Sequence, residues 1–505
     1  MIAEISRWLF LAVSIVLSVY GANALLITMM FLFRRATGKK PFRTEPADSI
    51  DWPTVTLQLP VYNEAALVRR LIDAAARMDY PAAKLSIQVL DDSHDPTARV
   101  AEERVEYWKA KGKAVSHIRR TIRTEYKAGA LRRGMEEDGS EFLAIFDADF
   151  APPPDWLKRA MAPFFAPGGE RVGMVQTRWT HVNESESPMT RAQALMLDGH
   201  YGVEKRVRSD EGMFFNFNGS GGVWRRKCIE EAGGWSGETL SEDLDLSYRA
   251  QLKGWVFKYL ADVTAPADLP TSMTAYKIQQ FRWSKGGMQV ARRMVPQILR
   301  ARVSAWKKMH GVLHVTGYIV HLMMCLMVLL SLPLAFAGPD SLKGLPSVWM
   351  AVGAMGGPVL LSAAAWSLHS KEEWWKRIVW MPVAVMLGTG VAVSNSVAGI
   401  AGLLDIHSPF QRTPKAVNRA GNGRLPDAAE MPDQPPAATW LELAMAAYAV
   451  SAFMIHVHLG IWINAVYLLF YAAGFSWAAV ASLLEIYWPC LAKAFRSKAA
   501  DAHTR

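Results

Sequence analysis

An uncharged run near the start of the chain is the strongest constraint on its fold. Residues 8–33 contain no Asp, Glu, Lys or Arg, and most of their side chains are apolar. A helix needs about 20 apolar residues to cross a lipid bilayer, so this run is long enough. No small-residue cleavage site with a polar start follows it. The run therefore predicts a retained membrane anchor rather than a removed signal peptide.

Basic residues directly after the anchor indicate its orientation. Arg34, Arg35, Lys39 and Lys40 follow the run at once. Lys and Arg are concentrated in the cytoplasmic flanks of membrane spans. The C-terminal flank of the anchor is therefore predicted to lie in the cytoplasm.

Four more apolar stretches lie in the C-terminal part of the chain. They are 311–336, 346–368, 439–456 and 459–485. Each is close to the length of a span, and basic residues flank them so that they form two hairpins with cytoplasmic ends. The sequence thus predicts an integral, multi-pass protein of the inner (cytoplasmic) membrane, in contact with membrane lipids.

Segment 376–404 is also apolar enough to span once. A single crossing would place the basic loop that follows it outside the cytoplasm. Trp374, Trp375 and Trp380 stand at its start, and indole rings favour the membrane interface. We therefore expect this segment to lie in the interface or to re-enter on one side, with a true span as the alternative.

The composition divides the chain into unlike parts. The mean hydropathy of +0.07 is too low for a wholly embedded transporter and high for a soluble enzyme. Between the apolar ends, residues 41–305 are charged and long enough to bury a core. We predict an N-terminal anchor at 1–40, a cytoplasmic catalytic domain at 41–305 and a C-terminal set of transmembrane and interfacial helices at 306–505.

Two classes of protein are excluded by counts. Three cysteines in 505 residues, Cys228, Cys325 and Cys490, argue against a disulfide scaffold and a Cys-rich zinc site. The formal net charge is +10, but the basic clusters flank the apolar segments, as membrane topology predicts. A nucleic-acid partner is therefore not expected, and the sequence does not reveal partner subunits.

The central part alternates between predicted strands and helices. Strands are expected at 54–60, 86–90, 142–150 and 172–176, and helices at about 64–78 and 97–111. Such alternation is typical of an α/β domain with a mainly parallel sheet. Ligands of these sheets bind beyond the carboxyl ends of the strands. Two of those ends carry acidic pairs: Asp91 with Asp92, and Asp147 with Asp149.

The pair Asp147 and Asp149 follows an apolar strand and precedes a run of prolines. Two carboxylates at this spacing suit Mg²⁺ or Mn²⁺ shared with phosphates, although a solvated turn would look the same. No phosphate-binding loop of the Walker type is present.

Two later segments carry further polar groups. A helix is predicted from about 242, and Glu242 and Asp243 at its start could act as a general base or as partners of the helix dipole. Next come Gln279, Arg282 and Trp283, where an Arg could neutralise phosphate and a Trp could stack on a sugar. An anchor at the membrane interface is the alternative for these side chains.

The order of these motifs resembles the inverting family-2 glycosyltransferases of the cellulose synthase superfamily. The matching stretches are VYNEAALVRRLIDAA, IQVLDDSHDPT, YKAGALRRGM, IFDADFAP, FNGSGGVWRR, EAGGW, SEDLDLSYRAQLKGW and QQFRWSKGG. They are most similar to cellulose-synthase-like mannan and glucomannan synthases and their bacterial relatives. Ser241 stands where the family usually has Thr. The resemblance implies a GT-A fold, a Rossmann-like α/β domain between transmembrane helices.

The resemblance also implies a role for each matching residue. Asp243 is implied as the catalytic base, and Asp147 and Asp149 as ligands of the Mg²⁺ or Mn²⁺ cofactor. The residues implied in binding the nucleotide sugar are Asp91, Asp92, Lys127, Asp147, Gln279 and Arg282. Those implied in binding the acceptor are Asn218, Gly219, Glu242 and Trp283. A loop at about 406–424 resembles a gating loop that closes over the nucleotide, through Phe410, Arg412, Thr413 and Lys415.

The predicted function is the transfer of a hexose from a nucleotide sugar, of the UDP-glucose or GDP-mannose type, to a growing β-glycan at the membrane. The alternative is the transfer of one sugar to a lipid acceptor of the ceramide or diacylglycerol type. A non-catalytic scaffold or channel subunit is a third reading, which the retained acidic motifs disfavour.

Overall fold

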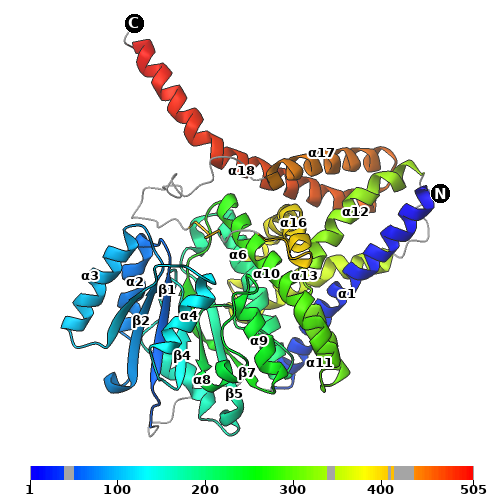
Figure 1. The fold of residues 1–505 in the computed structure, drawn as a ribbon. Helices are drawn as coiled ribbons and strands as arrows, with labels where there is room; N and C mark the ends of the chain where they lie inside the picture. The colour runs from blue at the N-terminus through cyan, green and yellow to red at the C-terminus, as the bar shows by residue number, and fades with distance from the viewer. Residues whose placement is uncertain (1, 39–50, 338–346, 408–410, 415–436, 504–505) are drawn as a thin grey trace.

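The computed structural model describes residues 2–38, 51–337, 347–407, 411–414 and 437–503. Figure 1 shows an α/β domain on one side and a set of long helices on the other. The first helix, α1 (Ile2–Ala36), belongs to the helical side although it precedes the α/β domain in the sequence.

Seven strands form one mixed sheet in the order β3-β2-β1-β4-β6-β5-β7. Neighbouring strands are parallel, except that β6 runs antiparallel to both β4 and β5. The strands are β1 (Val55–Val61), β2 (Leu85–Asp91), β3 (Val115–Arg119), β4 (Phe142–Ile145), β5 (Val172–His181), β6 (Gly222–Arg225) and β7 (Val256–Ala267).

Helices cover both faces of the sheet, which explains why the central strands are apolar on both sides. One buried cluster joins the sheet to α2 (Ala65–Ala76), α3 (Thr97–Ala110) and α5 (Trp156–Met161). A second cluster on the opposite face joins it to α4 (Tyr126–Glu136), α8 (Arg226–Glu231) and α9 (Glu242–Leu252). The predicted α/β domain is confirmed.

The strand directions explain why distant motifs meet. The parallel strands β1, β2 and β4 end at one edge of the sheet, where Tyr62, Asp92 and Asp147 follow them. Because β6 is antiparallel to β4, it begins at this same edge, with Gly222 opposite Ile145. The loop that carries Asn218 is thereby brought to the carboxylates.

Several boundaries differ from the sequence prediction. The strand expected at 142–150 ends at Ile145, so Asp147 and Asp149 lie in the turn beyond it. The span expected at 311–336 is two helices, α11 (Ala305–Val315) and α12 (Ile319–Phe336). The apolar pattern continues across the break at 316–318, so hydropathy alone did not reveal it. Strands β3, β6 and β7 were not predicted.

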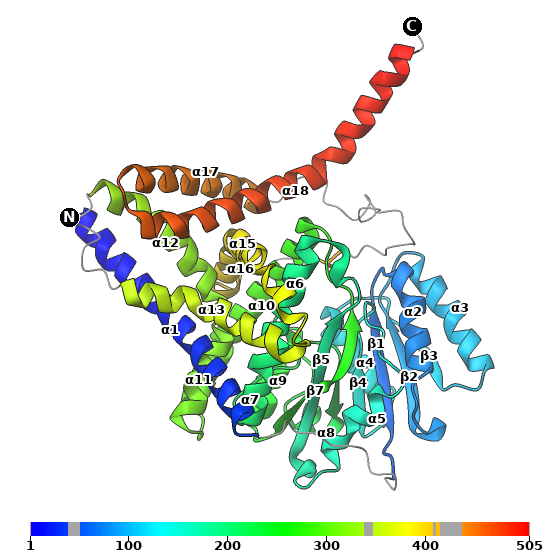
Figure 2. The ribbon, with the colours of Figure 1, turned by 180° about the vertical axis from the view of Figure 1, so that it is seen from behind.

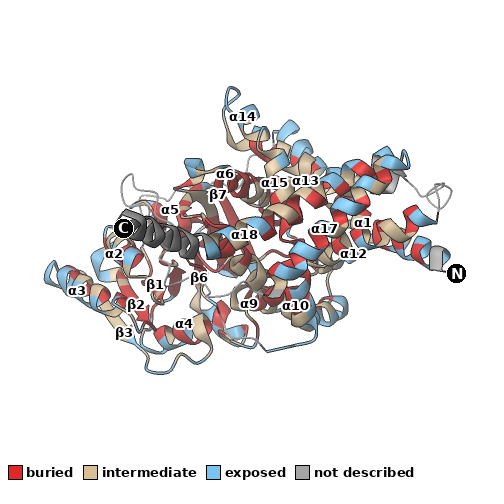
Figure 3. Ribbon diagram, turned by 90° about the horizontal axis from the view of Figure 1, so that it is seen from above, coloured by how far each residue is buried: buried red, intermediate tan, exposed pale blue. Residues whose placement is uncertain are grey.

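Five helices are long and apolar enough to cross a membrane, and they coincide with the five predicted stretches. They are α1, α12, α13 (Ser347–Leu368), α17 (Ala437–His458) and α18 (Trp462–His503). Only 22% to 39% of each apolar stretch is buried inside the protein. The other positions are partly or fully exposed, and Figure 3 shows tan and pale-blue positions alternating with red along these helices. Since large apolar surfaces of this kind need lipid, the chain is an integral membrane protein.

Segment 376–404 is bent, which fits both the re-entrant prediction and its alternative, a single broken span that would be the sixth. It forms α14 (Trp374–Ile378), α15 (Met381–Gly390) and α16 (Ala392–Leu403), with a bend of 42° before α16. Helix α16 packs on α10 (Met273–Arg300) through glycines. A methyl group on Gly402 would stand 2.4 Å from the Lys285 carbonyl oxygen, so only a small residue permits this contact.

The remaining helices connect the two sides. Helices α6 (Pro188–Asp198) and α7 (Lys205–Asp210) are joined by a π-helical turn at Gly199–Glu204. Viewed from behind, α13 runs beside α1 toward this region (Figure 2). The π-helical turn thus lies between the α/β domain and the membrane helices.

Candidate active site

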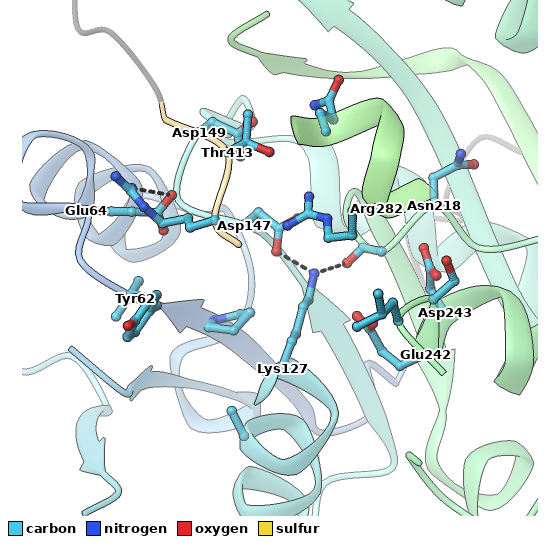
Figure 4. A pocket seen from close by; sticks show the side chains of 18 of the residues that line it. Tyr62, Glu64, Lys127, Asp147, Asp149, Asn218, Glu242, Asp243, Arg282 and Thr413 are labelled. Carbon is cyan, nitrogen blue, oxygen red and sulfur yellow. Dashed lines mark hydrogen bonds and ion pairs between the residues drawn. The ribbon is translucent and has the colours of Figure 1, made fainter. Parts of the chain in front are cut away.

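A cavity of about 180 Å³ opens at the edge of the sheet where the motifs meet. Its walls come from strand ends, from the loop before β6, from the start of α9 and from α10. The predicted site residues that line it are Asp92, Lys127, Asp147, Asp149, Asn218, Gly219, Glu242, Asp243, Gln279, Arg282, Trp283, Arg412 and Thr413. Figure 4 shows Tyr62 and Glu64 on one side of Lys127 and the acids Glu242 and Asp243 on the other. We call the side with Tyr62, Glu64 and Asp92 the donor wall, and the side with Glu242, Asp243 and Trp283 the acceptor wall. The names follow the roles that the sequence resemblance implies.

On the donor wall, Asp92 is held by arginine. Arg120 donates to both of its carboxylate oxygens, from Nε at 2.8 Å and from Nη2 at 2.5 Å. The guanidinium of Arg123 lies 3.5 Å from the centre of the Tyr62 ring and 3.7 Å from Asp92 Oδ2. Planar groups and cations in this arrangement can bind an aromatic base or a phosphate.

Asp91 does not line the cavity. Its side chain is inaccessible to solvent, and its Oδ2 lies 2.9 Å from His117 Nε2. Burial would raise its pKa, but hydrogen bonds from His117 and Ser93 outweigh burial and hold the pKa below the usual value. The structure therefore gives Asp91 a place behind the donor wall rather than the expected contact with the nucleotide.

Lys127 stands in the middle of the cavity. Its ammonium group donates to Asp147 and, at 2.8 Å, to the Gly219 carbonyl oxygen (Figure 4). Burial works against its charge, but the carboxylates of Asp147, Glu242 and Asp243 raise its pKa above the usual value. A permanent positive charge thus lies between the two walls.

The chemistry of the carboxylates fits a divalent cation. Asp147 and Asp149 both line the cavity and supply hard oxygen ligands. In the described part of the chain, no three His, Cys, Asp or Glu side chains are grouped to hold a metal by themselves. Mg²⁺ and related ions are commonly held by one or two carboxylates together with substrate phosphates and water. The pair fits that pattern.

The acceptor wall holds Asp243 in a different environment. Burial, and then the negative charge of Glu242, raise the pKa of Asp243 to about 7. The Leu244 N–H donates to its Oδ1 at 2.8 Å and fixes the carboxyl group at the start of α9. A carboxylate whose pKa lies near neutral pH is suited to accept a proton.

Gly219 permits the close approach of the two walls. Its φ of +80° lies in the left-handed region that favours glycine. A methyl group added there would lie 3.2 Å from Asp243 Oδ2 and 3.5 Å from Lys127 Nζ. The predicted site residue Gly219 therefore acts through its backbone.

Gln279, Arg282 and Trp283 lie on one face of α10, because positions i, i+3 and i+4 of a helix are neighbours. All three line the cavity. The start of α10 is fixed by α18: Glu485 accepts hydrogen bonds from the Met273 and Thr274 N–H groups at 2.7 and 2.8 Å. The membrane helices thus help to position this wall.

Part of the predicted gating loop lies over the cavity. Arg412 and Thr413 line it, and Arg412 Nη1 lies 3.5 Å from Glu64 Oε1. Phe410 and Lys415 fall outside the described residues. The loop position is therefore seen only at 411–414.

Sequence reasoning missed several lining residues, among them Tyr62, Glu64, Arg123 and Trp179. Tyr62 and Glu64 belong to the matching stretch VYNEAALVRRLIDAA and could have been found from it. Trp179 lies in the second half of β5, and the predicted strand ended before it. Arg123 lies between two elements with no motif of its own.

Comparisons with known proteins agree with this geometry. Residues 53–286 match the model of a family described as glycosyltransferase like family 2. The solved mannosyltransferase PcManGT from Pyrobaculum calidifontis, in complex with GDP-Man and Mn²⁺, has a similar fold, with a TM-score of 0.50 at 20% identity. The match covers 79% of this chain and 100% of that one.

Curated relatives extend the similarity. Glucomannan 4-beta-mannosyltransferase 1 of Oryza sativa subsp. japonica is 40% identical over 299 residues, 57% of this chain and 57% of its own length. Glucomannan 4-beta-mannosyltransferase 2 of Arabidopsis thaliana is 40% identical over 297 residues, 57% of this chain and 55% of its own length. The chain thus matches somewhat more than half the length of these relatives.

The fold and the cavity define a GT-A domain placed between membrane helices, as the sequence predicted. Residues 53–286 match the family-2 glycosyltransferase model, and the similar relatives are named glucomannan 4-beta-mannosyltransferases.

Proposed function

We propose that this protein is a metal-dependent, inverting hexosyltransferase that extends a β-glycan at the membrane. One observation carries the proposal: a single cavity brings together the carboxylates Asp147 and Asp149, the cations Lys127 and Arg282, and the acid Asp243. Transfer from a nucleotide sugar needs these three kinds of group: oxygen ligands for a metal, cations for the diphosphate and a base for the acceptor.

The residues divide the chemistry between the two walls. Asp243 accepts the proton of the acceptor hydroxyl, which lies against Trp283. Lys127 and Arg282 offset the charge that grows on the leaving diphosphate. Attack from the side opposite the diphosphate inverts the anomeric carbon, so an α-linked donor gives a β-linked product. Arg412 and Thr413 line the cavity, so segment 411–414 would cover a bound donor and help to exclude water.

A divalent cation would be held by Asp147 and Asp149 and would supply positive charge to the diphosphate oxygens. The donor set supports Mg²⁺ or Mn²⁺ equally. The similar solved structure is a complex with Mn²⁺, which supports a divalent ion of this kind.

The proposed donor is GDP-mannose. The similar relatives are named glucomannan 4-beta-mannosyltransferases, and the similar solved structure contains GDP-Man. A β-mannan or glucomannan chain is the matching acceptor. UDP-glucose is the donor that a glucan product would require.

The proposed topology follows the basic flanks. The anchor at 1–40 and the helices at 306–505 would hold the catalytic domain, 41–305, on the cytoplasmic side of the inner membrane. If segment 376–404 does not span, the five candidate spans would place the catalytic domain and the basic residues after the last apolar stretch on that side.

The test is an assay of the purified protein with Mg²⁺ or Mn²⁺ against UDP- and GDP-sugars. We expect GDP release from GDP-mannose and labelled mannose in a polymer that a β-mannanase digests. No turnover with any donor would overturn the proposal. An α-linked product would overturn the inverting mechanism.

A lipid acceptor is the second candidate, and one feature favours it. A largely apolar cavity of about 810 Å³ lies among α1, α12, α13, α15 and α18 and could hold hydrocarbon. Its lining includes Tyr20, His321, Met324 and Phe470. Labelled sugar in a chloroform-soluble product, with none in polymer, would support this candidate over the first.

A further inference from the structure

A second cavity, of about 240 Å³, lies behind the acceptor wall and continues the active site toward the membrane helices. It shares Trp179, Asn218, Ser241, Asp243 and Trp283 with the catalytic cavity. Its other lining residues include His200, from the turn between α6 and α7. A sugar that presents its hydroxyl to Asp243 would extend into this space.

The π-helical turn Gly199–Glu204 forms one side of the second cavity. Its glycines press against α13: a methyl group on Gly199 would lie 2.5 Å from Leu361 Cδ2, and one on Gly202 would lie 2.7 Å from Leu368 Cδ1. The opposite side of the turn carries His200 into the cavity. Wide turns of this kind are frequent at functional sites, because they change which side chains face a ligand.

His200 is held by a chain of charged groups. Its Nδ1 lies 3.0 Å from Glu204 Oε2, and the other oxygen of Glu204 accepts a hydrogen bond from Arg208 Nε at 2.8 Å. Arg208 is buried and also donates to the carbonyl oxygens of Phe214 and His310. The Glu204 carboxylate is thus shared between His200 and Arg208, and these contacts fix the orientation of the His200 ring.

The other ring nitrogen of His200, Nε2, faces Asn218. The Asn218 Nδ2 lies 3.4 Å from His200 Nε2, and its backbone N–H donates to Gln176 Oε1 at 2.9 Å. With Nδ2 turned to His200, the carboxamide oxygen is turned away. This Oδ1 is buried, and no described group hydrogen-bonds to it. A buried acceptor without a partner is costly, so this oxygen is suited to a ligand donor.

We infer that His200 is a positioning residue for the acceptor: it fixes the Asn218 carboxamide so that Oδ1 accepts a hydrogen bond from a hydroxyl of the acceptor glycan. The inference rests on the proposed function, since it concerns how the same site holds its acceptor. It assigns no proton transfer to His200. The group that Asn218 Oδ1 recognises is a sugar hydroxyl next to the hydroxyl that attacks the donor.

The test measures both substrates separately, with GDP-mannose as donor and a soluble β-mannan oligosaccharide as acceptor. In H200F, which keeps a ring but removes both nitrogens, we expect the acceptor KM to rise about tenfold, the loss typical of one hydrogen bond. The donor KM and the slow hydrolysis of GDP-mannose in the absence of acceptor are expected to stay unchanged. In H200Q, whose amide can donate to Glu204 and accept from Asn218, we expect most of the acceptor affinity to return.

A double-mutant cycle separates positioning from general damage. If His200 acts through Asn218, then H200F adds nothing to the loss seen in N218A. Additive losses would overturn the inference, and so would a rise in donor KM for H200F alone. The matched control is H458F, the same exchange at an exposed histidine at the end of α17, which should leave both KM values unchanged.

The outcome of this test is distinct from that of the proposed function. If the unaltered protein turns over no donor, the function itself fails. If it transfers mannose and H200F has an unchanged acceptor KM, only the assignment of His200 is wrong.

Discussion

The pKa values of the carboxyl groups at the donor and acceptor walls of the cavity are shifted in opposite directions. Asp91, behind the donor wall, has its pKa held below the usual value by hydrogen bonds from His117 and Ser93, despite burial. Asp243, on the acceptor wall, has its pKa raised to about 7 by burial and by Glu242. Binding a cationic or hydrogen-bonding partner needs a fixed charge, whereas accepting a proton needs a group that can change its charge. The contrast agrees with the proposed division between a wall that binds the donor and a wall that reacts with the acceptor.

The two walls also differ in how they are built. The donor wall is made by residues that directly follow strands β1, β2 and β4 of the sheet. The acceptor wall is made by α9, α10 and the loop before β6, and α10 is in turn fixed by α16 and α18. Each wall has a histidine and a carboxylate behind it: His117 with Asp91, and His200 with Glu204. The donor wall therefore depends on the α/β domain, and the acceptor wall depends on the membrane helices as well.

The largest effect is expected from D243N. Loss of a general base commonly costs 10² to 10⁴ in rate, so we expect labelled hexose transfer to fall by at least about a hundredfold. Donor KM should change little, because the donor wall is intact. The exposed E238Q in the preceding loop is the control. Transfer by D243N at the rate of the unaltered protein would show that Asp243 is not the base.

The same variant tests stability. The pKa of Asp243 is higher in the folded protein than its ordinary value of 3.8, so its contribution to stability is lost as pH rises from about 4 to about 7. D243N cannot ionise and is therefore expected to unfold at a higher temperature than the unaltered protein at pH 8. The difference should shrink toward pH 4. An equal difference at both pH values would contradict the raised pKa.

Metal binding should give the next largest effect. A chelator should abolish transfer, and Mg²⁺ or Mn²⁺ should restore it. D149N removes one of the two carboxylates proposed to hold the metal, so the metal concentration for half-maximal rate should rise at least about tenfold, the smallest change usual when metal-site partners are lost. D155N alters an exposed acid nearby and serves as the control. Full activity of D149N at low metal would remove Asp149 from the metal site.

A smaller effect is expected from pH. Because Asp243 must be ionised to accept a proton, kcat/KM should rise about tenfold per pH unit below pH 7 and level off above it. The affinity for GDP, measured by binding, should not change with pH over this range, since Asp91 stays ionised throughout it. The pH profile of kcat/KM is measured at constant metal saturation. A flat profile between pH 5 and 8 would contradict the assignment of Asp243 as the base.

The smallest effect, on H117F, sharpens the comparison of the walls. It removes a hydrogen bond to Asp91, so we expect the donor KM to rise about fivefold, within the usual range for one hydrogen bond, and the acceptor KM to stay the same. H200F is the mirror experiment on the acceptor wall. If both variants changed both KM values, the two walls would not be separate binding regions.

The sequence by itself determined the elements whose signals are local. The five spans follow from apolar length, and the α/β domain follows from alternating patterns with acids at strand ends. Gln279, Arg282 and Trp283 were singled out from the sequence, whereas their position on one face of α10 is seen in the structure. The tertiary structure decided what depends on strand direction and on contacts between distant segments. Asp91 turned inward to His117, β6 ran antiparallel and carried Asn218 to Asp243, and the π-helical turn placed His200 beside it. A linear pattern does not encode these placements, because each arises from packing between residues that are far apart in the chain.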